Sequence, residues 1–115
     1  MTEENLTYNE IPERSVHEIL TEFASGVPGR VASALLSAAW YAPSREWAEL
    51  AAVALSNVED LEVQWATTLA LGHVAQRSGH LNKPALSVLI RRLRARTELA
   101  ARLDDLEDDL STFLS

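Results

Sequence analysis

Three histidines are the side chains of this sequence best suited to metal binding or acid–base chemistry. His17 and His73 fall in segments with helical periodicity, and His80 lies in a turn-like segment. No HExxH, GxSxG, GxxxxGK[ST] or GxGxxG segment accompanies them, and the chain has no cysteine. A histidine without a placed partner is weak evidence for catalysis, so we favour a structural role for His73. The sequence therefore predicts no catalytic residue, no metal site and no bound cofactor.

A run of acidic residues near the C-terminal end is the strongest functional feature of the sequence. It comprises Asp104, Asp105, Glu107, Asp108 and Asp109. On a helix, Asp104 and Asp108 share a face, as do Asp105 and Asp109, and like charges at this spacing repel each other. Acids near a helix C-terminus also oppose the helix dipole. We interpret Asp104, Asp105, Asp108 and Asp109 as the first candidates for contact with a basic partner; an acidic solubilising tail is the alternative interpretation.

A second group of candidate contacts lies earlier in the chain. It contains Glu46, Trp47, Glu49, Glu59, Asp60 and Glu62. Charged neighbours surround Trp47, which is either a binding anchor or a core residue, since tryptophan is over-represented among interface hot spots. Trp65 follows the apolar stripe of its helix, and for it we favour the core. The last three acids of the group sit near a helix start, where the helix dipole favours negative charge, so they also have a purely structural explanation.

The charge of the chain is unevenly distributed. Residues 1–62 hold eleven acids and three arginines, residues 63–103 hold six arginines, Lys83 and one acid, and residues 104–115 hold five acids and no base. The formal net charge of −7 disfavours binding to nucleic acid or to an anionic membrane. The arginines have no aromatic residue among them to stack a base, so we expect a solvated face with Arg94–Glu98 and Glu98–Arg102 pairs.

Two features of the sequence bear on its compartment. No apolar stretch approaches the ~20 residues that span a bilayer. The first residues, MTEENLTYNE, are acidic and polar, whereas a secretory signal needs a basic start and an apolar run. Together with the absence of cysteine, these features indicate a cytoplasmic protein without a membrane partner.

Helical periodicity runs through most of the chain, and no segment shows the period-two alternation of a half-buried strand. Ser15 and Glu18 have the spacing of a capping box at the start of the first helix. Asn57 or Asp60 can cap the fourth helix, and Gly79 is placed to end it. We expect helices to begin near residues 13, 28, 43, 57–60, 84 and 97, and the last two are either separate or continuous.

The sequence predicts one all-α domain over residues 1–115, with residues 1–10 as a loose arm. Five or six helices joined by short turns favour antiparallel hairpins, which would make a HEAT-like short α-solenoid; a simple six-helix bundle is the alternative. The residues expected in the core are Leu35, Leu50, Leu55, Trp65, Leu69, Val74, Leu89, Leu93, Leu103 and Leu106.

One segment of the chain resembles known families. DLEVQWATTLALGHVA, residues 60–75, resembles a HEAT-type unit, and LGHVAQRSGHL, residues 71–81, is similar to a signature of small helical immunity proteins of bacterial polymorphic-toxin systems. These systems include contact-dependent growth inhibition. ARLDDL, residues 101–106, resembles the final segment of the same proteins, so the likeness covers about residues 57–110. In physical terms Gly72 would let another helix approach closely, and Gly79 would adopt a left-handed conformation.

The resemblance implies an immunity protein that binds and neutralises a cognate toxin domain and performs no catalysis itself. Many such toxin domains are nucleases, which need a basic surface to hold phosphates, and an acidic protein can cover that surface. The alternative is a helical adapter or regulatory protein that binds a protein or peptide without inhibiting a toxin.

Overall fold

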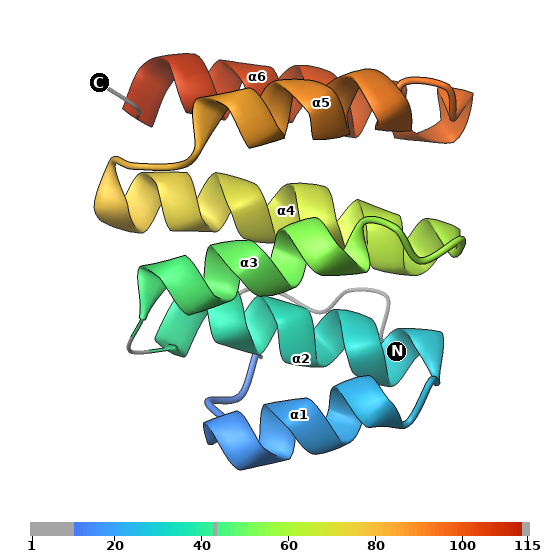
Figure 1. Ribbon diagram of the computed structural model, residues 1–115, viewed down its shortest axis with the longest axis vertical. Coiled ribbons are helices and arrows are strands. Elements are labelled where there is room, and N and C mark those ends of the chain that lie inside the picture. The colour runs from blue at the N-terminus through green and yellow to red at the C-terminus, as the bar shows by residue number, and fades with distance from the viewer. Residues whose placement is uncertain (1–10, 43, 114–115) are drawn as a thin grey trace.

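The computed structural model describes residues 11–42 and 44–113, and within them every regular element is helical (Figure 1). This confirms the all-α prediction. A break after Leu93 and a short 3-10 turn, η3, separate the fifth helix from the sixth. The elements are α1 (Val16–Ala24), α2 (Pro28–Tyr41), α3 (Arg45–Leu55), α4 (Leu61–Ser78), α5 (Lys83–Leu93), η3 (Thr97–Leu99) and α6 (Ala100–Phe113).

Local hydrogen bonds fix the ends of the helices where the sequence indicates them. The Ser15 N–H donates to Glu18 Oε1 at 2.8 Å and the Glu18 N–H donates to Ser15 Oγ at 3.1 Å, which confirms the capping box. Asp60, and not Asn57, caps α4 by accepting the Val63 N–H at 3.0 Å. Gly79 ends α4 with a φ of 74°, the left-handed conformation that glycine adopts without strain.

The helices stack along one axis, with α1 at one end and the α5–α6 pair at the other (Figure 1). Helix α4 lies in the middle and packs against α2, α3 and α6. Arg77, in the last turn of α4, donates to the carbonyls of Ala39 and Ala42 and so satisfies the C-terminal end of α2. The contacts agree with stacked hairpins, and assignment to the HEAT type stays a prediction.

The segment before α1 lies along α2. Ser37 Oγ donates to the Pro12 carbonyl at 2.8 Å and the Tyr41 hydroxyl donates to the Ile11 carbonyl at 3.2 Å. Ile11 is itself buried and belongs to the core, whereas most of the other residues of this segment are exposed. The loose arm expected over residues 1–10, and Pro43 at the expected start of the third helix, lie outside the described residues.

Most of the predicted core is confirmed, with two errors. Leu35, Val74, Leu89, Leu93, Leu103 and Leu106 are buried, and Leu55 and Leu69 pack against the core while partly exposed. Leu50 is 68% exposed and Trp65 is 42% exposed, so both predictions were wrong. Helix α3 turns Ala48 and Ala52 inward, which directs Leu50 outward.

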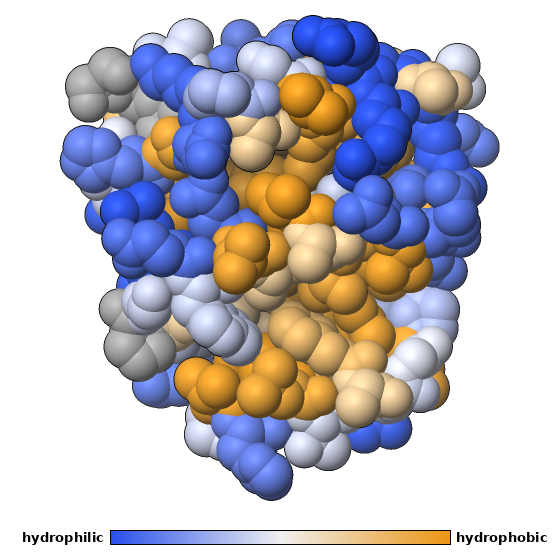
Figure 2. Space-filling model, in the orientation of Figure 1, coloured by the Kyte–Doolittle hydropathy of each residue, from blue (hydrophilic) through white to orange (hydrophobic). Residues whose placement is uncertain are grey.

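One face of the molecule carries a broad apolar band, which runs across the region of α1, α3 and α5 (Figure 2). Each of these helices has an exposed apolar side chain: Leu20, Leu50 and Val88. In the part of the chain that the structure describes, no helix is both long enough and apolar enough to cross a membrane.

Truncation of a buried leucine tests this packing. We expect Leu103→Ala to lower the free energy of unfolding by about 2–5 kcal/mol, because Leu103 is fully buried and its loss leaves a cavity. The matched substitution Leu50→Ala, at an exposed position, should change it by less than about 0.5 kcal/mol. Urea unfolding followed by circular dichroism measures both, and equal effects of the two substitutions would contradict the assignment.

Candidate protein-binding surface

The acids of α6 are partly neutralised by arginines of the same protein. Arg94, at the C-terminal end of α5, bonds to Asp104 at 3.2 Å and to Glu107 at 2.6 Å. Arg102 pairs with Asp105 at 2.9 Å. The expected pairs of these arginines with Glu98 are therefore wrong. Exposed pairs of this kind contribute little to stability, but they offset the repulsion within the acidic run.

Asp109 differs from the other acids of α6 because it packs against α4. A Cβ atom added at Gly72 would stand only 2.6 Å from Asp109 Oδ2, so the carboxylate occupies the space that a side chain at position 72 would need. Burial raises the pKa of the Asp109 carboxyl above its ordinary value; Arg102 opposes this shift, and Asp105 and Asp108 add to it. The close approach expected at Gly72 is thus confirmed. It makes Asp109 a packing residue, and the other three first candidates stay at the surface.

The close approach predicts a specific steric conflict. We expect Gly72→Ala to change the free energy of unfolding by less than about 1 kcal/mol, because the cost of displacing the Asp109 carboxylate, the movable end of its side chain, is offset by the higher helix propensity of alanine. In the Asp109→Ala background, the same Gly72→Ala substitution should raise the free energy of unfolding by about 1 kcal/mol, because the steric conflict is then absent. Gly29→Ala is the matched control, since its Cβ would lie at an ordinary 3.6 Å from Glu62. Additive effects of the substitutions at 72 and 109 in urea unfolding would argue against the contact.

The second candidate group divides into surface residues and residues used by the fold. Glu46, Glu59 and Glu62 are exposed. Glu49 is buried: its carboxylate accepts the Asn82 N–H at 2.7 Å and lies 3.8 Å from Arg45. Asp60 caps α4 as described above, and Trp47 is partly buried against the core. Glu49, Asp60 and Trp47 therefore have structural roles, which explain their presence without a binding partner.

Trp65 is the surface residue that the sequence interpretation missed. It lines a cavity of about 430 Å³ together with Leu61, Glu62, Glu98 and Leu99, which we call the Trp65 cavity. The Arg102 guanidinium lies 5.9 Å from the centre of the indole ring. Apolar residues occupy more than one side of α4, a pattern typical of a helix that is buried all round, so no sequence signal marked Trp65 as exposed. A partly exposed tryptophan with a charged rim is the usual composition of a protein-binding hot spot.

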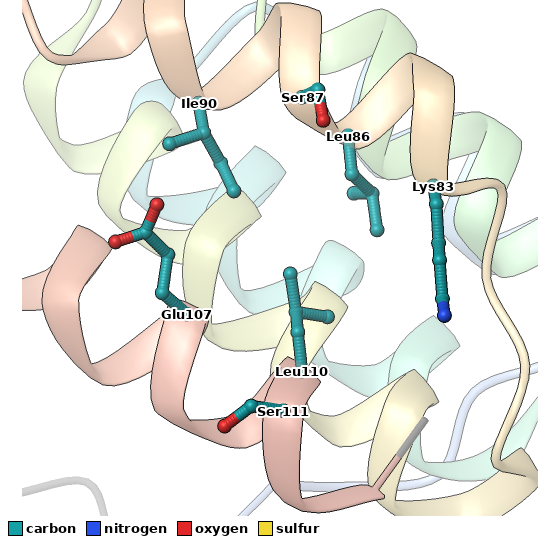
Figure 3. A pocket seen from close by; sticks show the side chains of 7 residues that line it. All are labelled: Lys83, Leu86, Ser87, Ile90, Glu107, Leu110 and Ser111. Carbon is teal, nitrogen blue, oxygen red and sulfur yellow. The ribbon is translucent and has the colours of Figure 1, made fainter. Parts of the chain in front are cut away.

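A second groove lies between α5 and α6 (Figure 3). Its volume is about 360 Å³, and its apolar lining comes from Leu86, Ile90 and Leu110. Lys83 stands toward one end and Glu107 toward the other (Figure 3). The α6 acids, this groove and the Trp65 cavity are all formed with residues of the region from α4 to α6.

His73 packs in an aromatic contact. Its ring meets the Trp40 ring edge-on with 4.5 Å between the centroids. Burial, followed by the charges of Arg102 and Arg77, lowers the pKa of His73 from 6.5 to about 4, so the ring is neutral at pH 7. Among residues 11–42 and 44–113, no group of three or more histidine, aspartate or glutamate side chains could hold a metal ion. These contacts support the structural interpretation of His73.

The lowered pKa of His73 predicts a pH dependence of stability. Below pH 6.5 His73 becomes protonated in the unfolded chain, whereas in the folded chain it stays neutral down to about pH 4. The free energy of unfolding therefore falls as the pH falls through this window. Because the ring is partly exposed, we expect about 1–2 kcal/mol of this loss between pH 7.5 and pH 5. The loss should be absent in His73→Gln and present in His17→Gln, an exposed histidine on α1. Identical pH profiles of the two variants would refute the assignment.

No protein-family model matches the sequence, and neither does any curated protein. Among solved structures, the chain is similar to a chain in the crystal structure of a CDI complex from Cupriavidus taiwanensis LMG 19424. The TM-score is 0.80 and the sequence identity 26%, over 95% of this chain and 98% of that chain. The protein therefore shares its fold with a component of a CDI complex along almost its whole length.

Proposed function

We propose that the protein is a cytoplasmic immunity protein that binds and neutralises the toxin domain of a contact-dependent growth inhibition system. The observation that carries the proposal is the likeness to a chain of a CDI complex at a TM-score of 0.80, with nearly full coverage of both chains. The resemblance of residues 71–81 and 101–106 to small helical immunity proteins supports it independently, because that resemblance rests on sequence motifs.

The charge of the protein suggests how it would neutralise its partner. The α6 surface presents Asp104, Asp105, Glu107 and Asp108, of which two share the single cation Arg94. A nuclease toxin needs a basic surface to hold phosphates, and an excess of carboxylates attracts such a surface and covers it. Occupation of the toxin's active-site surface is sufficient, and no catalysis by this chain is required.

Co-expression tests the proposal. The toxin domain encoded beside this chain should stop the growth of cells when expressed alone, and growth should recover when this chain is expressed with it. The two purified proteins should form a stable complex at micromolar concentration. A toxin domain from an unrelated CDI system is the specificity control and should be neither bound nor neutralised. Failure to protect and to bind would refute the immunity role and favour the adapter alternative.

Two charge-matched variants test which acidic surface the toxin meets. Asp104→Asn with Asp108→Asn removes two charges from one face of α6, and Glu46→Gln with Glu59→Gln removes two charges from the exposed members of the second group. We expect the α6 variant to slow association about threefold or more at low ionic strength, and the difference should shrink as salt rises. Stopped-flow mixing measures the rates. A larger effect of the second variant would place the contact near α3 and the start of α4.

A further inference from the structure

We propose that the Trp65 cavity receives an arginine side chain of the partner protein. The inference rests on the proposed function, because the partner is taken to be the toxin domain. The cavity has a volume of about 430 Å³ and is lined mainly by apolar atoms, with Glu62 and Glu98 bordering the indole of Trp65 and two leucines. An occupant of matching chemistry has an apolar stem and a cationic head.

In the part of the chain that the structure describes, the two acids beside the cavity have no ion-pair partner because the nearby arginines pair with other acids. Glu98 stands four residues after Arg94 and four before Arg102, the spacing at which a helix would pair them. Arg94 bonds instead to Asp104 and Glu107, and Arg102 to Asp105. Among the described residues, neither Glu98 nor Glu62 has an ion-pair partner. The cavity therefore keeps two negative charges beside its apolar wall.

Arginine fits this arrangement better than the other cationic side chain. Its planar guanidinium stacks on an indole and presents several N–H donors, whereas the lysine ammonium is a compact and strongly hydrated charge. Its methylene stem can cover the exposed apolar parts of Leu61 and Trp65 while the head reaches the carboxylates. Trp65 already interacts with one guanidinium, that of Arg102, whose charge Asp105 offsets.

Three variants of the full chain, measured against the toxin domain, test the proposal. Trp65→Ala should weaken the complex by about 30-fold or more, the loss typical of a hot spot. Glu62→Gln combined with Glu98→Gln, which keeps the shape of the cavity, should weaken it about tenfold. Leu50→Ala, another exposed apolar side chain, should bind within about twofold of the natural chain. Unfolding curves establish that each variant is folded.

The partner's arginine is found by a double-mutant cycle. Each surface arginine of the toxin domain is replaced by glutamine, and one replacement should no longer be sensitive to Glu62→Gln with Glu98→Gln. If the complex forms and none of the cavity variants weakens it, the inference is overturned while the proposed function stands.

If no complex forms, the proposed function fails, and the arginine specificity of the cavity is tested with a small molecule instead. N-acetyl-arginine amide at millimolar concentration should shift the Trp65 indole N–H resonance, which is assigned by its loss in Trp65→Phe. The uncharged citrulline analogue should leave it in place, and Glu62→Gln with Glu98→Gln should abolish the arginine shift. Equal responses to the two amides, or no response to either, would overturn the inference.

Discussion

The enclosure of α4 by three other helices is the constraint on which the rest of the structure depends. A helix with neighbours α2, α3 and α6 needs small residues where they approach, and Ala66, Ala70, Gly72 and Ala75 are all buried. Little of its circumference is left for solvent, and Leu61 and Trp65 stand there. The indole is thus carried by a helix that contacts three others, which fixes the position of its backbone.

The distribution of arginines decides which acids remain available to a partner. Arg94 is shared between Asp104 and Glu107, and Arg102 between the indole of Trp65 and Asp105. These exposed pairs contribute little to stability. Their larger effect is on the electrostatic field, since they cancel charge around α6 and leave it uncancelled at the rim of the Trp65 cavity. Some acids of the run are therefore bound within the protein, and others remain available at its surface. The sequence alone does not distinguish the two groups.

The helices could be predicted from the sequence because their ends depend on local chemistry. The capping box at Ser15, the left-handed turn at Gly79 and the proline at the start of α2 each act within a few residues. Periodicity also found most of the core. Periodicity could not show which apolar side of a helix faces the core. Trp65 and Leu50 were therefore assigned to the core, although both are exposed.

The roles of individual charges depended on contacts that no local pattern contains. Glu98 was expected to pair with Arg94 and Arg102, but Arg94 reaches across to two acids of α6, and Arg102 pairs with Asp105 on α6 itself. Glu49 was expected at the surface, but its partner is a backbone N–H 33 positions away. These distances in sequence explain why the fold was better predicted than the site, where tertiary geometry selects the partner of each charge.

The bond between Glu49 and Asn82 limits how modular the stack can be. In an ideal repeat array each unit contacts only its neighbours, and the interfaces between neighbouring units supply much of the stability. Here the second hairpin, α3–α4, holds a buried carboxylate whose hydrogen-bond donor is the backbone N–H of Asn82, just before the third hairpin, α5–α6. The Asn82 side chain itself caps α5. A chain shortened to its first two hairpins would leave that acid without its donor. Surface residues can therefore vary without disturbing this contact, whereas loss of the last two helices would break it.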